Sequence, residues 1–376
     1  LAFDASGGMG GDRVVKAIRG WSEKPFHTLV YTHGHVDHVG GSGHFLADAE
    51  ARGDARPRVA GHENVARRFE RYDLTNGFNL LINDRQFRGF QKRGYAIGGG
   101  RHFLPPDALP VDTAYRDRLQ LEVGGLAFEL RHARGETDDH SWAWIPSKKA
   151  ICAGDFFIWN FPNAGNPQKV QRYPGEWAAA LREMAKMGAE LFLPAHGLPI
   201  AGRERIARVL DEVASALENL VSEVLLRMNA GAKLNDILHE VKVPEEVLAK
   251  PYLVPLYDDP EFVVRNVWRL YGGWYDGNPS HLQPARDAAL AEELATLAGG
   301  AKTLGKRATA LAEAGDLRLA SHLIEYACTA APADRDLQAR RADIYQLRRD
   351  AERCLMAKGI YGYAAGESRE RAEEAD

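Results

Sequence analysis

"YTHGHVDHVGG", residues 31–41, decides the fold class of this chain, because three histidines and an aspartate fall within six residues. The stretch follows an apolar, β-type run and precedes glycines, so it predicts a loop between a strand and a helix. Residues on one face of a helix lie three or four positions apart, and this spacing does not fit that pattern. On a loop, His33 and His35 can point to one metal ion, and Asp37 and His38 can turn toward a second. A polar, histidine-rich loop without a metal is the alternative interpretation.

Composition places the chain among ordinary soluble globular proteins. Its 376 residues are enough for two or three domains with a sizeable core, and 27% charged and 45% hydrophobic residues are usual values. A net charge of -4 argues against non-specific nucleic-acid binding, which needs a basic surface. No apolar run approaches the length of a membrane span. The cysteines, Cys152, Cys328 and Cys354, are far apart and odd in number, which predicts reduced thiols rather than a disulfide framework.

The first residues already have the pattern of a buried strand. The chain opens with Leu1 rather than Met, and "LAFDASGG" predicts a strand followed by a turn. We therefore expect the natural N-terminus to lie before Leu1. No signal peptide is visible in the sequence, and we expect a cytoplasmic location.

Strand and helix patterns alternate up to about residue 201. Apolar, β-type runs predict strands within residues 1–6, 27–33, 57–62, 119–133, 141–146, 149–157 and 190–196. Helical spacing predicts helices within residues 11–21, 62–72 and 175–189. Strands that alternate with helices indicate an α/β layered core.

The pattern becomes helical after Gly202. A long amphipathic stripe ends near Gly231 and contains Ile206, Val209, Leu210, Val213, Leu217, Leu220, Val221 and Val224. An aromatic stretch rich in Pro and Gly follows, and the remainder is again helical. We therefore expect two domains, residues 1–202 and residues 203–376.

The histidine motif resembles that of the metallo-β-lactamase superfamily, in which a β-sandwich flanked by helices holds one or two metals at one edge. In that family a bridging carboxylate follows a strand in a small-Gly-Asp turn, and "ICAGDFF" offers Asp155. The last histidine ligand follows the final strand in a Pro-x-His-Gly context, and "LFLPAHG" offers His196. Taken alone, each is equally compatible with a turn aspartate or a loop histidine.

One ligand position narrows the resemblance to a branch of the superfamily. Most members place a histidine between these motifs, whereas the matching stretch "RHARGETDDHSWAW" offers Glu136. His132 and His140 flank this turn rather than occupy the position. A glutamate here is similar to the ligand of the alkylsulfatases, the class III sulfatases.

The helical region extends this resemblance over nearly the whole chain. Residues 271–284, "YGGWYDGNPSHLQP", and residues 297–327 resemble the alkylsulfatase dimerisation domain. The implied fold is a metallo-β-lactamase αββα sandwich followed by an all-α dimerisation domain, in a homodimer. Two features depart from the branch: Asp155 stands where its best-known members have a second glutamate, and the sequence stops before the sterol-carrier-like domain that many of them carry.

The resemblance implies a dizinc hydrolase that cleaves the sulfate ester of an aliphatic alcohol with hydroxide supplied at the metals. The implied ligands include Asp37 and Asp155, which also have catalytic roles; the full set is His33, His35, Asp37, His38, Glu136, Asp155 and His196. The fold supports many chemistries, so hydrolysis of a lactone, thioester, β-lactam or phosphodiester is the competing hypothesis. A helical interaction protein on a vestigial metal fold is the non-enzyme alternative, and the complete ligand set argues against it.

Charge indicates what the substrate pocket needs. Two zinc ions with three carboxylate ligands and a hydroxide form a neutral set, so a sulfate monoanion needs a further cation. Lys169 and Arg172 lie where alkylsulfatases have a sulfate-binding arginine, and Asn163 can donate hydrogen bonds to the anion; surface or turn roles are the alternatives. Residues 98–101 offer a second candidate, an anion-binding backbone nest.

Overall fold

The computed structural model describes residues 1–91 and 101–373, which divide into two compact units. The first unit contains residues 1–82 and 101–274, and the second contains residues 83–91 and 275–373. Helix α5 (Asn76–Gln91) contributes residues to both units. The predicted division after residue 202 follows the change from strands to helices, whereas the compact first unit continues to Trp274. As a functional boundary, residue 202 stays a prediction.

A parallel sheet forms one half of the first unit. Its strands lie in the order β1 (Ala2–Phe3), β2 (Thr28–Val30), β3 (Arg58–His62) and β4 (Thr113–Tyr115), and each neighbouring pair is parallel. Parallel neighbours need crossover connections, which helices provide here. The crossovers contain α1 (Gly11–Arg19), α2 (Val36–Val39), α3 (Ser42–Arg52) and α4 (Asn64–Leu74).

The second sheet is mixed. Its order is β10 (Ile200–Ala201), β9 (Leu191–Pro194), β8 (Ala150–Gly154), β7 (Ser141–Ile145), β6 (Leu126–His132) and β5 (Arg118–Val123). Only β8 and β9 are paired in parallel within this sheet, and α6 (Pro174–Lys186) lies in their crossover. The single strand run predicted over residues 119–133 is two strands, because Gly124 (φ 60°) and Gly125 (φ 74°) form a two-residue hairpin turn.

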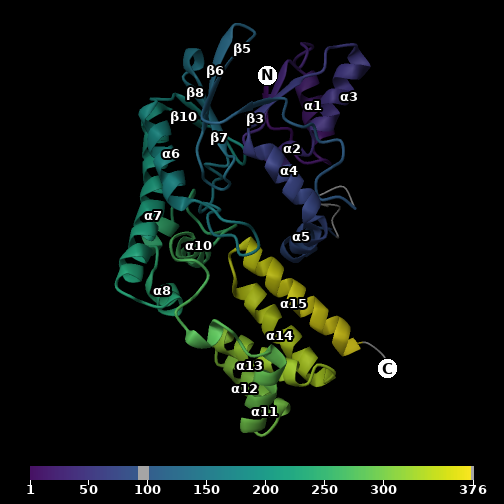
Figure 1. Ribbon diagram of the computed structural model, residues 1–376, viewed down its shortest axis with the longest axis vertical. Coiled ribbons are helices and arrows are strands. Elements are labelled where there is room, and N and C mark those ends of the chain that lie inside the picture. Colours follow the sequence, from purple (N-terminus) through teal and green to yellow (C-terminus); the bar gives the residue numbers. More distant parts are fainter. Residues whose placement is uncertain (92–100, 374–376) are drawn as a thin grey trace. The chain divides into compact units, whose positions relative to one another are not determined.

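Alternate residues of the buried strands face different layers. Leu29 of β2 packs with Val15 and Phe45 on the α1 and α3 side, whereas Val30 packs between the sheets with Leu130. On the other side of the sandwich, the β8 side chains split in the same way between the intersheet core and the layer of α6 and α7. Strands buried on both faces explain the nearly continuous apolar runs. Figure 1 shows α1 and α3 outside one sheet and α6 and α7 outside the other, which confirms the αββα sandwich.

The predicted amphipathic stripe lies on α7 (Arg203–Asn229), and every residue of the stripe is buried. It packs against α6 and α10 in the core of the first unit. The unit also contains η1 (Pro146–Lys148), α8 (Leu234–Glu240), α9 (Glu245–Leu248) and α10 (Pro260–Gly272). The long helix therefore supports the sandwich directly, although the sequence pattern changes where it begins.

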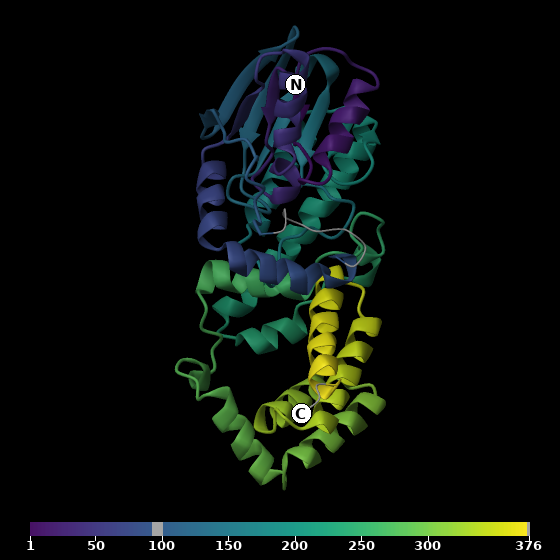
Figure 2. The ribbon, with the colours of Figure 1, turned by 90° about the vertical axis from the view of Figure 1, so that its right-hand side faces the viewer.

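The second unit is helical in its described residues. It comprises η2 (Pro279–His281), α11 (Asp287–Leu297), α12 (Ala301–Glu313), α13 (Leu317–Ala330), α14 (Arg335–Ala351) and α15 (Leu355–Glu373). Asp316 and Asp334 cap α13 and α14 by accepting hydrogen bonds from backbone N–H groups. Helices α14 and α15 lie side by side (Figure 2). No helix among the described residues is long and apolar enough to cross a membrane.

Candidate metal centre

The loop between β2 and α2 carries the first four candidate ligands. His33 and His38 are buried, whereas His35 is half-buried and the Asp37 side chain is 54% exposed. Asp4 holds both ends of this loop: its carboxylate accepts hydrogen bonds from Thr32 N and Oγ1 at 2.7 and 2.8 Å, and lies 2.8 Å from His38 Nδ1. The second ring nitrogen of His38 is thereby left to face the site.

A buried ion pair holds the middle of the same loop. Asp139 accepts a hydrogen bond from Gly34 N (3.0 Å) and two from Arg68 of α4, from Nε at 2.7 Å and from Nη2 at 2.9 Å. A Cβ at Gly34 would lie 2.8 Å from Arg68 Cδ and 2.9 Å from Asp139 Oδ2, so a side chain between the candidate ligands His33 and His35 would displace this ion pair. Sequence reasoning missed this pair. The available signal was the adjacent aspartates 138 and 139 before β7, since a buried one needs a cation.

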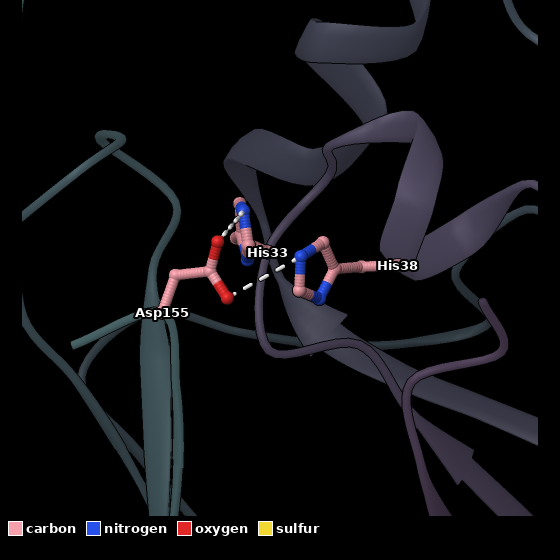
Figure 3. Close-up of side chains that lie close together, drawn as sticks. All are labelled: His33, His38 and Asp155. Carbon is pink, nitrogen blue, oxygen red and sulfur yellow. Dashed lines mark ion pairs between the residues drawn. The ribbon is translucent and has the colours of Figure 1, made fainter. Parts of the chain in front are cut away.

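Asp155 and His196 reach the same edge because β8 and β9 run parallel and each residue follows its strand end. Asp155 Oδ1 lies 3.4 Å from His38 Nε2 and 3.5 Å from His196 Nε2, and Oδ2 lies 4.0 Å from His33 Nε2. Figure 3 shows the Asp155 carboxylate pointing between His33 and His38. One carboxylate therefore faces histidines on both sides.

The seven predicted ligands fall into three overlapping groups in the described chain. Within each group, the potential ligand atoms lie within 4.8 Å of one another. The groups are His33, His38 and Asp155; His33, His35 and Glu136; and Asp37, His38 and His196. Residues from four separate segments, the loop of residues 33–38 and the segments of Glu136, Asp155 and His196, thus converge on one locus.

Buried polar atoms test whether this locus suits a metal. His38 Nε2, Asp155 Oδ1 and Glu136 Oε2 are buried and have no hydrogen-bond partner among the described residues. Buried polar atoms are normally paired, so these three need another partner. Imidazole nitrogens and carboxylate oxygens converging without thiolates are a donor set that divalent metals accept. The residues fit a metal site.

The pKa shifts favour the protonation states in which most of the seven candidate ligands can bind a metal. Burial lowers the pKa of His33 and His35 well below the usual value, so both imidazoles are neutral. Burial opposes charge on His38, but Asp155, Asp4 and Asp37 outweigh it and raise the pKa of His38 well above its usual value. Because Asp155 and Asp37 are also candidate ligands, metal binding and proton release from His38 are linked.

Glu136 is held by two residues that the sequence assigned to the substrate. Arg172 is buried, and its Nη1 lies 2.6 Å from Glu136 Oε1 and donates to the Glu136 carbonyl at 3.1 Å. Asn163 Nδ2 also donates to Glu136 Oε1. Both side chains therefore orient a candidate ligand, which leaves Glu136 Oε2 as its unpaired oxygen.

Lys169 has a different environment. It is half-buried, its Nζ lies 5.5 Å from the centre of the Phe103 ring, and it interacts electrostatically with Asp37 and Glu136. Burial lowers the pKa of Lys169 to about 8. Among the described residues it forms no ion pair within 4.0 Å, so its charge is available to a ligand. The other candidate for an anion site, residues 98–101, lies outside the described residues except for Arg101.

Hydrogen bonds to α10 and to the turn before it hold the segment that contains Asn163, Lys169 and Arg172. Asp258 is buried and accepts hydrogen bonds from Gly165 N (2.6 Å) and Asn166 N (3.2 Å). Asn266 donates to the Arg172 carbonyl at 2.9 Å. The sequence did not predict this support, because nearly one hundred positions separate the partners.

The flanking histidines have structural contacts. His140 accepts a hydrogen bond from Asp155 N (3.1 Å) and stacks on Phe156, with 4.0 Å between ring centres. His132 stacks on His62 at 3.8 Å. Neither His132 nor His140 belongs to a group of converging ligand atoms in the described chain.

Comparisons with known proteins agree with this architecture. Residues 4–196 match the family profile of the metallo-beta-lactamase superfamily, and residues 233–371 match that of alkyl sulfatase dimerisation. A solved structure of the stereoselective inverting sec-alkylsulfatase Pisa1 from Pseudomonas sp. aligns over 100% of this chain and 62% of its own, with a TM-score of 0.84 and 21% identity. At that identity the likeness concerns the fold.

Curated relatives are named as sulfatases. Linear primary-alkylsulfatase from Pseudomonas sp. (strain ATCC 19151) is 26% identical over 348 residues, covering 87% of this chain and 64% of that protein. Alkyl/aryl-sulfatase BDS1 from Saccharomyces cerevisiae is 23% identical over 353 residues, covering 88% of this chain and 53% of that protein. The chain thus spans between half and two thirds of the length of these relatives.

Proposed function

The chain belongs to the metallo-β-lactamase superfamily, and we propose that it hydrolyses sulfate esters of aliphatic alcohols with two zinc ions bound at the candidate metal centre. The observation that carries this proposal is the Asp155 carboxylate, which faces His33 on one side and His38 and His196 on the other. A carboxylate in that position suits a bridge between two metals. The alkylsulfatase names of the curated relatives give the substrate class.

The ligands divide between two proposed zinc sites. His33, His35 and Glu136 form the first, in line with their converging ligand atoms. Asp37, His38 and His196 would form the second, and Asp155 would contribute to both. Zinc is the metal proposed because the donors are imidazoles and carboxylates without thiolates.

When bound, zinc lowers the pKa of a coordinated water toward neutrality and so supplies a hydroxide nucleophile. Asp37 and Asp155 act as anions: desolvation opposes the ionisation of both, although the Asp37 side chain is 54% exposed, and the neighbouring His38 and His196 outweigh it and hold the pKa of both carboxyls well below the usual range. We assign them the catalytic role of accepting hydrogen bonds from the attacking water and so orienting it. Water labelled with ¹⁸O tests the bond cleaved, since label enters sulfate after attack at sulfur and enters the alcohol after attack at carbon.

Lys169 is the cation proposed to hold the sulfate group. Its ammonium interacts electrostatically with Asp37 and Glu136 and forms no ion pair among the described residues. Arg172 is already paired with Glu136, so its proposed contribution is to hold that ligand rather than the substrate. The apolar tail is proposed to lie along the adjoining cluster of Val36, Tyr72, Phe103, Leu80 and Leu104.

Metal analysis and a substrate panel test the proposal together. We expect close to two zinc ions per chain and hydrolysis of dodecyl sulfate, with little activity on nitrocefin, a lactone, a thioester or a phosphodiester. Preference for one of those substrates would support the competing hydrolase function. A zinc-loaded protein without any of these activities would favour the interaction protein.

We also propose a homodimer formed through the region after residue 202. The match of residues 233–371 to the alkyl sulfatase dimerisation family supports it. Light scattering at micromolar concentration is expected to give twice the chain mass of 41.5 kDa. A monomer under those conditions would contradict this assignment.

A further inference from the structure

The loop that carries His196 is the least buried part of the metal centre. Residues 195–199 connect β9 to β10, and all five are exposed. The His196 side chain is 47% exposed, whereas that of His38 is 2% exposed. Surrounding side chains therefore do little to fix the ring, and the backbone of this loop has to be held by other means.

Two hydrogen bonds tie this loop to the segment around Asp155. Ala195 N donates to the Gly154 carbonyl at 3.0 Å, on the strand side of His196. Trp159 Nε1 donates to the Leu198 carbonyl at 2.7 Å, on the other side. The segment that supplies one candidate ligand thus holds the loop that supplies another.

The Trp159 indole also packs against this loop. A Cβ added to Gly197 would lie 2.2 Å from Trp159 Cδ1, so the ring occupies the space beside the residue next to His196. Trp159 itself has φ 55°, a left-handed conformation that is unfavourable for a tryptophan and persists only where its surroundings enforce it. Its ring meets the buried Phe157 edge to face, with 5.5 Å between centres. The indole is therefore a fixed support.

We propose that Trp159 is a positioning residue for His196: its indole N–H and ring hold residues 197–198 so that the His196 imidazole faces Asp37 and Asp155. His196 Nε2 lies 3.5 Å from a carboxylate oxygen of each. Without the indole, the exposed loop can move and the imidazole loses its fixed direction. This inference rests on the proposed ligand role of His196.

Trp159→Phe tests the inference, because it keeps an aromatic ring and removes the N–H donor. Zinc dissociation constants are measured by chelator competition on the full chain. We expect one of the two zinc ions to bind about tenfold more weakly, the scale of losing a group that orients a metal ligand. Trp144→Phe, which changes another half-buried tryptophan on β7, is the matched control and should leave both constants unchanged.

His196→Ala identifies the affected ion and separates this inference from the proposed function. It should remove one zinc, and adding Trp159→Phe to it should not weaken the remaining zinc further. Gly197→Ala is a second variant, which retains the tryptophan but places a Cβ against its ring at a residue with φ 99°; it should displace the same loop and weaken the same ion as Trp159→Phe.

Three results would overturn the inference. If His196→Ala releases one zinc while Trp159→Phe and Gly197→Ala change neither constant, Trp159 does not position the ligand and the proposed function stands. Equal weakening of both ions by Trp159→Phe would mean a general structural role. Retention of two zinc ions by His196→Ala would remove the ligand role of His196 and the inference with it.

Discussion

The two loops that carry the candidate histidine ligands are built differently. The loop of residues 32–39 is largely buried and is held by charged groups: Asp4 at its ends and the Arg68–Asp139 pair at its middle. The loop of residues 195–199 is exposed and is held by the Gly154 carbonyl and the Trp159 indole. Damage to the first loop should therefore affect folding as well as metal binding, whereas damage to the second should affect one metal alone.

The difference follows from how deeply the polar groups of each loop are buried. Converging carboxylates and imidazoles in the buried loop are stable only if charges and hydrogen bonds around them are matched. The polar groups of the exposed loop can be hydrated by water, so this loop needs contacts that fix its position rather than partners for its charges. Five predictions test how the supports and charges around the two loops differ, in order of decreasing effect.

Arg68→Ala should have the largest effect on stability. It leaves Asp139 buried without its cation, which costs about 3–5 kcal/mol of unfolding free energy, and it frees Gly34 and its neighbouring ligands. Urea unfolding of the metal-free protein measures this loss of unfolding free energy. Arg116→Ala, which breaks an exposed pair with Glu63, is the control and should cost less than about 1 kcal/mol. Similar losses of unfolding free energy in the two variants would contradict the expected difference between buried and exposed ion pairs.

Lys169→Ala should lower kcat/KM for an alkyl sulfate by roughly ten- to a thousandfold, the scale of one charge-assisted contact. Zinc content and hydrolysis of any neutral ester should stay unchanged. Lys148→Ala, on the exposed η1 turn, is a matched control. Unchanged activity on the sulfate would mean that another group, such as Arg101, holds the anion.

Arg172→Ala should differ from Lys169→Ala, because its guanidinium lies against Glu136. We expect it to lower zinc affinity together with activity on every substrate. A loss confined to anionic substrates, with both zinc ions retained, would restore Arg172 to the substrate-binding role.

The activity on anionic substrates should depend on pH through Lys169. Burial lowers the pKa of this lysine to about 8, so the ammonium is present below that pH and is lost above it. As pH rises through about 8, kcat/KM for the sulfate should fall and approach about tenfold per pH unit. Lys169→Arg, which stays protonated, should remove this fall. An unchanged profile in Lys169→Arg would assign the titration to another group.

His132→Ala should have the smallest effect on the metal centre. His132 stacks on His62 and lies outside the converging ligand groups, so both zinc ions should remain. Glu136→Ala is the paired variant, and it should lose zinc from the first site. Loss of zinc from His132→Ala with full retention in Glu136→Ala would reverse the assignment of this ligand.

The patterns of the sequence by themselves indicated α/β layers and the long amphipathic helix, and its motifs, through their resemblance to the metallo-β-lactamase superfamily, indicated the sandwich and the seven residues that converge on one edge. These features depend on near neighbours: alternation along strands, helical spacing in residues 206–224, and short motifs at strand ends such as Asp155 and His196. The motif residues arrive together because parallel strands bring their carboxyl ends to the same edge. Even so, the hairpin glycines 124 and 125 were read as strand interior, since their positive φ is a property of the turn.

Only the tertiary structure decided which charges are buried and what they pair with. Arg68 with Asp139, Arg172 with Glu136, and Trp159 with Leu198 join residues 36 to 71 positions apart, where no local spacing marks a partner. Arg172 and Lys169 are both cations close together in sequence, yet Arg172 is buried against the candidate ligand Glu136, whereas Lys169 is half-buried and forms no ion pair among the described residues. The free-energy cost of a charge depends on how deeply it is buried, and its burial depends on packing between residues far apart in sequence. Local patterns in the chain therefore indicate which residues are candidates for the metal centre, and packing decides which residues hold those candidates in place.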